Sequence, residues 1–262
     1  MARITPLFSS SKGNSYYIGN KSGGILIDCG ASYSQIKSAM NLCGYDINAV
    51  KAVFITHEHS DHIKGLSVLQ KNLKVPIYAS TLTLDALIRD KQVYSEDELY
   101  SIDDGPMCEA GMEIKAFHTS HDCADSVGYS VYTEDERKIS ICTDLGYVTD
   151  EVKNAISGSD LCVLEANYDE KMLRDNVMYP TFLKKRISSN KGHLSNTDSA
   201  IEAKELIKSG TTRLILGHLS QNNNLPQIAM KRVLTELSDF TIGKDYLLDV
   251  APVATTGKSI IL

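Results

Sequence analysis

The 262-residue sequence lacks the features that would direct a protein out of the cell or into a membrane. Its first six residues, MARITP, do not show the charged and then apolar pattern of a signal peptide. None of its apolar runs approaches the length of about 20 residues that a membrane-spanning helix requires. We therefore expect a cytoplasmic protein without a membrane partner.

The sequence also lacks paired cysteines and an excess of basic residues. Its six cysteines include no CxxC pair, and several lie in apolar runs, so we expect buried, reduced thiols and no cysteine-based metal or redox site. With 27 lysines and arginines against 33 acidic residues, the formal net charge is -6. Because such a chain repels polyanions overall, nucleic-acid binding would need a local basic patch.

The composition is that of an ordinary globular protein, with 42% hydrophobic and 23% charged residues. Strand-like runs occupy residues 15–19, 24–29, 52–56, 77–79, 112–117, 127–133, 138–143, 160–165, 213–216 and 246–250, and helical patterns occupy residues 34–42, 61–72, 183–188, 196–208 and 226–237. Two blocks of strands followed by helices predict an α/β, four-layer αββα fold, in which two mixed β-sheets lie between helices. We find no linker or repeat, so we expect residues 1–262 to form a single domain.

Histidines are concentrated directly after one of these strands. The buried run VFIT ends in HEHSDH, residues 57–62, after which an amphipathic helical pattern begins. In an extended segment His57 and His59 point to the same side and can bind one ion, while Asp61 and His62 can face a second ion. Imidazole and carboxylate ligands without thiolate suit Zn²⁺ or Mn²⁺, with Fe²⁺ as a third option. The sequence therefore predicts a site for two divalent metal ions.

The HxHxDH motif at residues 57–62 resembles the signature of the metallo-β-lactamase-fold hydrolases. Residues 25–30 (ILIDCG) resemble the first motif of that superfamily, which implies that Asp28 orients a metal ligand through a hydrogen bond. The third motif supplies one histidine, and His118 and His121 are both candidates. We favour His121 because the following DSVGY segment is similar to that of the phosphodiesterase-like branches. The neighbouring Asp122 could contact a ligand or only solvent.

Two later motifs complete the ligand sets that the resemblance implies. Residues 141–146 (ICTDLG) resemble the fourth motif, in which Asp144 would bridge both ions, and residues 214–220 (LILGHLS) resemble the fifth, in which His218 would bind the second ion. One ion would be bound by His57, His59 and His121, and the other by Asp61, His62 and His218, with Asp144 and a water or hydroxide between them.

Residues 192–196 (GHLSN) resemble an additional histidine motif of the nuclease-like branches, among them the tRNA 3′-processing enzymes. Cleavage of a phosphodiester leaves an alkoxide that needs a proton, and His193 could donate it opposite the attacking hydroxide that bridges the metals. An ordinary backbone contact in front of a capped helix is the alternative for His193. We predict His193, Asp61 and Asp144 as the catalytic residues of a phosphodiesterase or nuclease.

Two segments could bind the phosphates of a substrate. Residues 176–197 contain four basic residues and no acid, although a solvated helix face explains the same run. Aromatic residues do not interleave with these basic residues, so the segment predicts no stacking platform for single strands. The loop SSSKGNS at residues 9–15 could present backbone N–H groups to a phosphate, or could be a plain hairpin turn. The predicted phosphate contacts are Lys12, Asn14, Lys185, Arg186, Lys191 and Ser195, the last of which also begins an S-x-x-D helix cap.

The order of these motifs, together with EANY at residues 165–168, resembles the bacterial YycJ/WalJ family. That resemblance implies a phosphodiesterase similar to 5′–3′ DNA exonucleases, with nucleic acid or another phosphodiester as its substrate. A thioester or lactone hydrolase of the same fold is an alternative, but it would gain nothing obvious from His193. A non-catalytic nucleic-acid-binding or regulatory scaffold is a second alternative.

Overall fold

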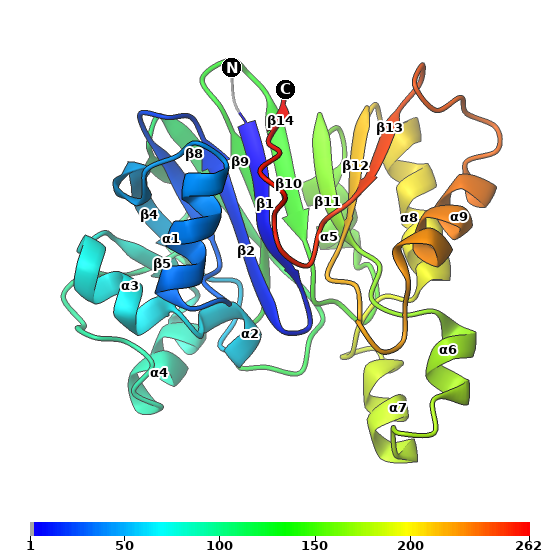
Figure 1. The fold of residues 1–262 in the computed structure, drawn as a ribbon, viewed down its shortest axis with the longest axis horizontal. Helices are drawn as coiled ribbons and strands as arrows, with labels where there is room; N and C mark the ends of the chain where they lie inside the picture. Colours follow the sequence, from blue (N-terminus) through cyan, green and yellow to red (C-terminus); the bar gives the residue numbers. More distant parts are fainter. Residues whose placement is uncertain (1–2) are drawn as a thin grey trace.

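The computed structural model describes residues 3–262 and contains two seven-stranded β-sheets that pack face to face (Figure 1). The first sheet has the order β14 (Ile260–Ile261), β1 (Arg3–Ser10), β2 (Gly13–Gly19), β3 (Gly24–Ile27), β4 (Val50–Phe54), β5 (Ile77–Ala79) and β6 (Leu99–Ser101). The second has the order β13 (Leu247–Val250), β12 (Arg213–Gly217), β11 (Leu161–Glu165), β10 (Lys138–Cys142), β9 (Val127–Tyr132), β8 (Met112–His118) and β7 (Met107–Glu109). Each sheet contains parallel and antiparallel pairs.

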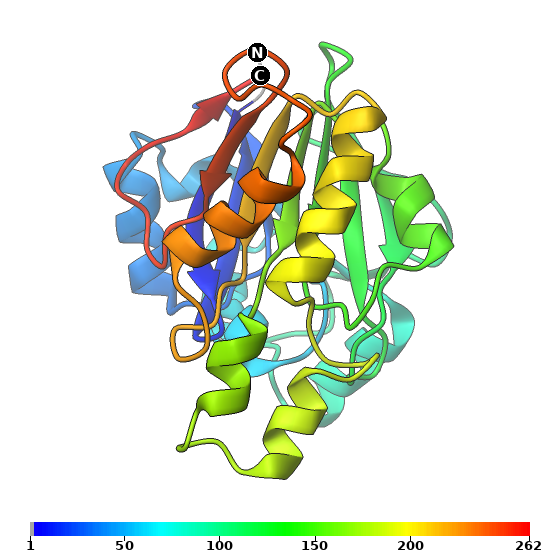
Figure 2. The same cartoon turned by 90° about the vertical axis from the view of Figure 1, so that its right-hand side faces the viewer.

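Helices cover the outer face of each sheet. The first sheet packs against α1 (Tyr33–Leu42), α3 (Leu66–Leu73) and α4 (Thr81–Arg89), and the second against α5 (Asp150–Ile156), α8 (Asn196–Lys208) and α9 (Pro226–Glu236). Figure 2 shows α8 and α9 lying across the second sheet. The predicted four-layer αββα fold with two mixed sheets is therefore confirmed.

Alternation along the strands explains why both faces of the sheets are apolar. In β3, Leu26 packs towards the helices, whereas Ile25 and Ile27 pack between the two sheets. The residues of a strand point to opposite faces in turn, so a strand that is covered on both sides must be apolar at every position. All four residues of β3 are buried accordingly.

The parallel strands bring several chain segments to one pole of the molecule. β3 pairs in parallel with β4, and β11 pairs in parallel with β10 and β12. In open sheets, ligands bind outside the carboxyl ends of such strands. Those ends lie at the bottom of Figure 1, where two further short helices, α6 (Glu170–Asp175) and α7 (Thr181–Ile187), project from the body.

One predicted helix is divided in the structure. The pattern over residues 61–72 predicted one continuous helix, but the chain forms α2 (Ser60–Ile63) and then α3, which starts after Gly65. The N–H of Gly65 donates to the carbonyl of Cys29 at 2.8 Å, and a Cβ at this position would lie 2.2 Å from the carbonyl oxygen of Ala31. Close packing on the loop after β3 therefore interrupts the helix, which a periodicity pattern does not register.

The burial of the cysteines and the lengths of the helices can be compared with what the sequence led us to expect. All six cysteines are free, and Cys29, Cys142 and Cys162 are buried as expected, whereas Cys108 is exposed. Within residues 3–262, no helix combines the length and the apolar character that crossing a membrane requires.

Candidate metal centre

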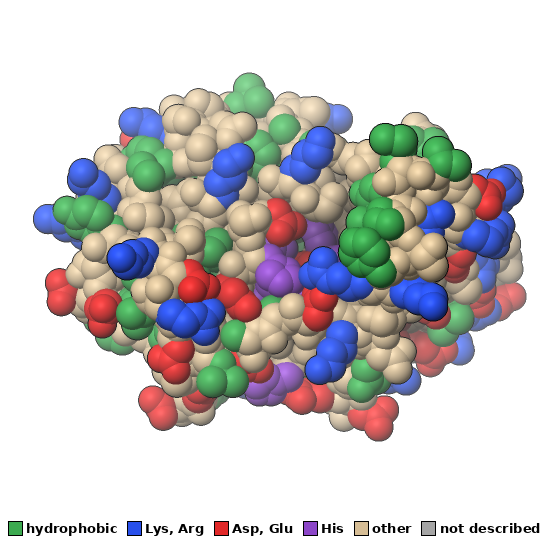
Figure 3. Space-filling model, turned by 90° about the horizontal axis from the view of Figure 1, so that it is seen from below, with side chains coloured by type: hydrophobic (Ala, Val, Ile, Leu, Met, Phe, Trp, Pro, Cys, Tyr) green, Lys and Arg blue, Asp and Glu red, His purple; other side chains and the backbone are tan. Residues whose placement is uncertain are grey.

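Five strand ends supply the side chains of one polar cluster. Asp28 follows β3, His57 follows β4, Asp144 follows β10 and His218 follows β12, while Glu165 ends β11. Figure 3 shows histidine side chains at the floor of a hollow, with acidic and basic side chains on its rim. The cluster therefore lies at the carboxyl ends of the parallel strands.

Three of these residues have a left-handed backbone. The φ angles of Asp28, Asp144 and His218 are 63°, 59° and 53°. A residue with a side chain rarely adopts this conformation, and it persists only where the surrounding structure holds it. Here the N–H of Asp28 donates to the carbonyl of Phe54, and the N–H of His218 donates to the hydroxyl of Ser9, both at 2.8 Å. The strained backbone turns these side chains into the hollow.

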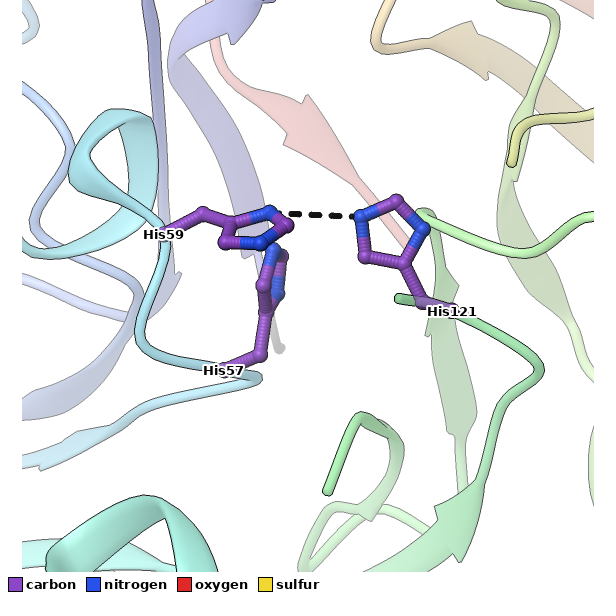
Figure 4. A group of neighbouring side chains, drawn as sticks. All are labelled: His57, His59 and His121. Carbon is purple, nitrogen blue, oxygen red and sulfur yellow. Dashed lines mark hydrogen bonds between the residues drawn. The ribbon is translucent and has the colours of Figure 1, made fainter. Parts of the chain in front are cut away.

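A first group of possible metal ligands consists of His57, His59 and His121. One nitrogen of each lies within 4.8 Å of the others, and Figure 4 shows the three side chains pointing toward one another. Nε2 of His121 lies 3.3 Å from Nδ1 of His59. Nδ1 of His121 donates to the carbonyl of Gly192 at 2.9 Å, which leaves Nε2 free to act as a ligand. The structure thus brings His121, and not His118, to the two histidines of the HxH motif.

A second group consists of Asp61, His62 and His218, whose ligand atoms also lie within 4.8 Å of one another. Nε2 of His62 is 3.5 Å from Oδ2 of Asp61, and Nε2 of His218 is 3.4 Å from the same oxygen. Nδ1 of His62 donates to Oδ2 of Asp28 at 2.8 Å, and the hydroxyl of Thr56 donates to that oxygen at 2.9 Å. The carboxylate of Asp28 therefore holds the ring of His62 through a hydrogen bond, and its effect on a metal ligand stays a prediction.

Asp144 lies between these two groups and belongs to two further groups of possible ligands, one with His57 and His62 and one with Glu165, His193 and His218. Its Oδ2 is 3.3 Å from Nε2 of His62, and its Oδ1 is 3.2 Å from Nδ1 of His218 and 3.7 Å from Nε2 of His121. Within residues 3–262, Oδ2 of Asp144 and Nε2 of His57 and of His218 are buried without a hydrogen-bond partner. Unpartnered buried polar atoms are costly, and all three atoms are of the kind that bind divalent metals. The residues therefore fit a metal site.

The electrostatics of the hollow also favour cations. Burial alone would lower the pKa of His62, but Asp144 and the neighbouring carboxylates raise it well above its ordinary value. Burial would likewise lower the pKa of His218, but Asp144, Asp61 and a further carboxylate raise it to about 10. For His57, burial and the adjacent imidazoles lower the pKa well below the ordinary value. A histidine binds a metal as the neutral imidazole, and the carboxylates that raise these two pKa values would also attract a divalent cation.

Sequence reasoning did not assign Glu165 to the site, although this side chain organises one side of it. Its Oε1 accepts hydrogen bonds from Nδ1 of His193 at 2.8 Å and from Nδ1 of His218 at 2.9 Å. Its Oε2 accepts the backbone N–H groups of Leu145 and Leu194. Burial would raise the pKa of Glu165, but His193 and His218 hold it well below its ordinary value. Glu165 is therefore a buried carboxylate that orients two imidazoles.

The position of Glu165 in the sequence carried a usable signal. β11 lies between β10 and β12 in the parallel part of the second sheet, and site residues follow both of those strands. An acidic residue at the carboxyl end of the strand between them must reach the same edge.

His193 lies next to the metal ligands and is partly open to solvent, with 20% of its side chain exposed. Its Nδ1 is 3.7 Å from Oδ1 of Asp144. Its ring centroid is 5.0 Å from that of His121 and 5.3 Å from that of His218. The structure therefore brings His193 to the edge of the hollow, where a bound molecule could reach it.

Two residues that the sequence left open lie outside both ligand groups. His118 has 60% of its side chain exposed and pairs through Nδ1 with Asp125 at 3.0 Å. Asp122 accepts two hydrogen bonds from the guanidinium of Arg186, and its Oδ1 lies 3.6 Å from Nε2 of His121. Arg186, a predicted phosphate contact, is thus held at the rim of the hollow by a carboxylate.

The predicted phosphate loop at residues 9–15 is a tight hairpin between β1 and β2. The N–H of Ser10 donates to Oδ1 of Asn14 at 3.1 Å, and the N–H of Lys12 donates to Oγ of Ser10 at 3.2 Å. The N–H groups of Ser10 and Lys12 therefore already have partners within the hairpin, and phosphate binding by this loop stays a prediction. Nδ2 of Asn14 instead lies 3.1 Å from Nε2 of His62 and 3.3 Å from Oδ2 of Asp61.

The remaining predicted phosphate contacts differ in exposure. Lys12, Lys185 and Lys191 are exposed. Ser195 is buried and caps α8, where its hydroxyl accepts the N–H of Asp198 and donates to the carboxylate of the same residue. Its hydroxyl is therefore committed to the helix cap.

The substitution Asp28→Asn tests whether the hydrogen bond between His62 and Asp28 contributes to metal binding. The amide oxygen of asparagine accepts the hydrogen bond from His62 more weakly than a carboxylate does. The substitution also removes a negative charge from the hollow. Since loss of such a supporting group typically costs about 10- to 100-fold in metal affinity, we expect a loss of this size in a chelator competition titration. Asp90→Asn, at an exposed carboxylate, is the matched control. Equal metal affinity of the Asp28 variant and the unmodified protein would contradict this role.

Comparison with known proteins agrees with this geometry. The family described as a beta-lactamase superfamily domain matches residues 24–219, which span both ligand groups. The chain belongs to the beta-lactamase superfamily. As the sequence motifs indicated, relatives of this superfamily member include an exodeoxyribonuclease YycJ of Bacillus anthracis, which is 35% identical over 243 residues, 92% of this chain and 91% of that protein.

A second relative is an exodeoxyribonuclease WalJ of Streptococcus pneumoniae, which is 32% identical over 256 residues, 95% of this chain and 94% of that protein. Among solved structures, the metallo-beta-lactamase fold protein YhfI from Bacillus subtilis has a TM-score of 0.72 at 20% identity and covers 97% of this chain and 98% of its own. The predicted superfamily, its YycJ/WalJ branch and the class of metal-dependent hydrolase are confirmed for this beta-lactamase superfamily member.

Proposed function

We propose that this chain is a dinuclear phosphodiesterase that degrades DNA from an end, as a 5′–3′ exonuclease does. The observation that carries the proposal is the placement of His193, fixed by the buried carboxylate of Glu165, beside the candidate metal ligands. The proposed ligands are His57, His59 and His121 for one ion, Asp61, His62 and His218 for the other, and Asp144 for both, with Zn²⁺ or Mn²⁺ as the metal.

Bound divalent ions would supply a water of lowered pKa and would stabilise the negative charge of the attacked phosphate. The chain itself must then protonate the leaving oxygen. Nδ1 of His193 faces Glu165, so the ring edge that carries Nε2 is the one available to a substrate. The Glu165 carboxylate stabilises the protonated imidazole, as a buried aspartate does for the histidine of a serine hydrolase. We therefore assign the donated proton to Nε2 of His193.

The relatives support DNA as the polymer. Two proteins named exodeoxyribonuclease are similar to this chain along more than nine-tenths of its length. A thioester releases a thiolate, which needs less assistance from an acid than the alkoxide of a phosphodiester does, so the pair of Glu165 and His193 is more useful for a phosphodiester than for a thioester. Hydrolysis of thioesters without cleavage of phosphodiesters would overturn the proposal.

Metal analysis of the purified protein, combined with assays on DNA and RNA labelled at either end, tests the proposed function. With Mn²⁺ or Zn²⁺ present, we expect two ions per chain and stepwise shortening of DNA from its 5′ end. The assay should include thioester and lactone substrates. Binding of DNA without cleavage under all metal conditions would instead indicate a non-catalytic scaffold.

A further inference from the structure

The arm formed by α6, α7 and the segment between them, residues 170–187, carries an apolar surface. Val177, Met178 and Phe182 have exposed fractions of 93%, 83% and 74%, the three highest among the large hydrophobic side chains of residues 3–262. None of the residues of α7 is buried. Figure 3 shows an apolar patch of this kind beside the hollow that holds the histidines. A contiguous exposed apolar surface in a folded protein usually marks a binding site.

The arm is held in place by hydrogen bonds, so its exposure is not that of a loose loop. Nδ2 of Asn176 donates to Oδ1 of Asn223 at 2.6 Å, and Nδ2 of Asn222 donates to the hydroxyl of Tyr179 at 3.0 Å. At the other end of the arm, the N–H of His193 donates to the carbonyl of Ile187 at 2.9 Å. The arm is therefore attached both to the loop after His218 and to the backbone of His193.

The apolar surface is connected to the hollow through α7. Phe182 and Arg186 are four residues apart, so they lie on the same side of this helix, about 6 Å apart along its axis. The guanidinium of Arg186 contacts Asp122, the residue after His121. A polymer that leaves the hollow over this rim would meet Arg186 first and Phe182 next.

The charge around the apolar surface indicates what covers it. Residues 176–197 contain four basic residues and no acid, in a chain of net charge -6, and the preceding Asp175 is paired with Lys171 and Arg174. Lys185 and Lys191 are exposed. A ligand that has apolar surfaces and regularly spaced negative charges would match both the apolar side chains and the basic residues. Single-stranded nucleic acid is such a ligand, because it offers open base faces together with phosphates. A duplex hides its base faces by stacking and pairing.

We propose that Phe182, with Met178 and Val177, forms a stacking platform on which the single-stranded segment of a nucleic acid substrate lies next to the metal centre. This inference rests on the proposed nuclease function for the choice of ligand. The aromatic side chain precedes the basic run and does not alternate with it, which is why the sequence pattern predicted no such platform.

Fluorescence anisotropy with a labelled, phosphorothioate-linked oligothymidylate that resists cleavage tests the platform. We expect Phe182→Ala to weaken binding about tenfold or more, because stacking of a base on an aromatic ring contributes strongly and without regard to sequence. Phe182→Trp retains a ring and should bind as the unmodified protein does. Leu42→Ala, at a residue with 62% exposure at the end of α1, removes a comparable apolar side chain elsewhere and should not change binding.

Equal affinity of Phe182→Ala and the unmodified protein would overturn the platform. An equal loss of affinity for a blunt duplex would also overturn it. If Phe182→Ala lost binding to phosphatidylglycerol vesicles or lost self-association, and still bound the oligothymidylate as the unmodified protein does, the platform would be overturned as well. Hydrolysis of bis(p-nitrophenyl) phosphate by the unmodified protein is measured in parallel. If the unmodified protein cleaves neither bis(p-nitrophenyl) phosphate nor DNA, this result counts against the proposed function. The affinities of the Phe182 variants for the oligothymidylate test the platform independently of cleavage.

Discussion

His193→Ala is expected to lower kcat for cleavage of DNA about 10²- to 10⁴-fold, the usual contribution of a positioned acid. The variant removes the imidazole that Glu165 orients, and it leaves in place the seven residues proposed above to bind the two ions. The metal content should therefore stay at the level of the unmodified protein. Single-turnover rates on end-labelled DNA, with metal analysis of the same samples, measure both quantities.

A second histidine variant serves as the comparison for His193→Ala. His118→Ala is the matched control, since it removes an exposed histidine outside both ligand groups. An unchanged rate for His193→Ala, or an equal loss for both variants, would rule out the proposed acid.

Asp144→Asn is expected to abolish hydrolysis and to reduce the number of bound ions. Asp144 lies near residues of both ligand groups, with its Oδ2 3.3 Å from Nε2 of His62 and its Oδ1 3.7 Å from Nε2 of His121. An amide keeps the shape of the side chain but removes its charge, so neither ion would retain its shared ligand. Metal analysis after exhaustive dialysis should show fewer than two ions per chain.

Thermal unfolding with and without EDTA distinguishes loss of metal from loss of folding in this variant. A ligand that binds only the folded state stabilises it by about 2.7 kcal/mol at 100 times its Kd, so EDTA should lower the Tm of the unmodified protein. The Tm of Asp144→Asn should respond less to EDTA. Asp104→Asn, at an exposed loop position, should behave as the unmodified protein does. Two tightly bound ions in the Asp144 variant would contradict the shared-ligand role.

Much of the fold could be predicted because the strands carry a strong local signal. The apolar runs at β3, β4, β11 and β12 follow from burial on both faces, a property of each segment alone. The break at Gly65 and the projecting arm were not predictable in the same way. Both depend on contacts with distant segments, namely the loop after β3 in one case and the loop after His218 in the other.

The residues of the candidate site also differ in how far they could be predicted from the sequence. The histidines of residues 57–62 are adjacent in the chain, so their density was visible without a structure. Glu165 is a single acid at the end of an apolar strand, and its function depends on two histidines that lie 28 and 53 residues further along. Exposure of Phe182 likewise follows from how α7 is attached, since an isolated phenylalanine in a sequence usually indicates a core position.

The left-handed backbone at Asp28, Asp144 and His218 affects what other sequences this fold could accept. Glycine adopts such a conformation without the steric cost that a side chain incurs, so at these three positions the residue that suits the backbone differs from the one that suits the chemistry. The identity of these three residues therefore follows from what their side chains contact, namely His62 for Asp28 and for Asp144, and Glu165 for His218, and not from the backbone that carries them.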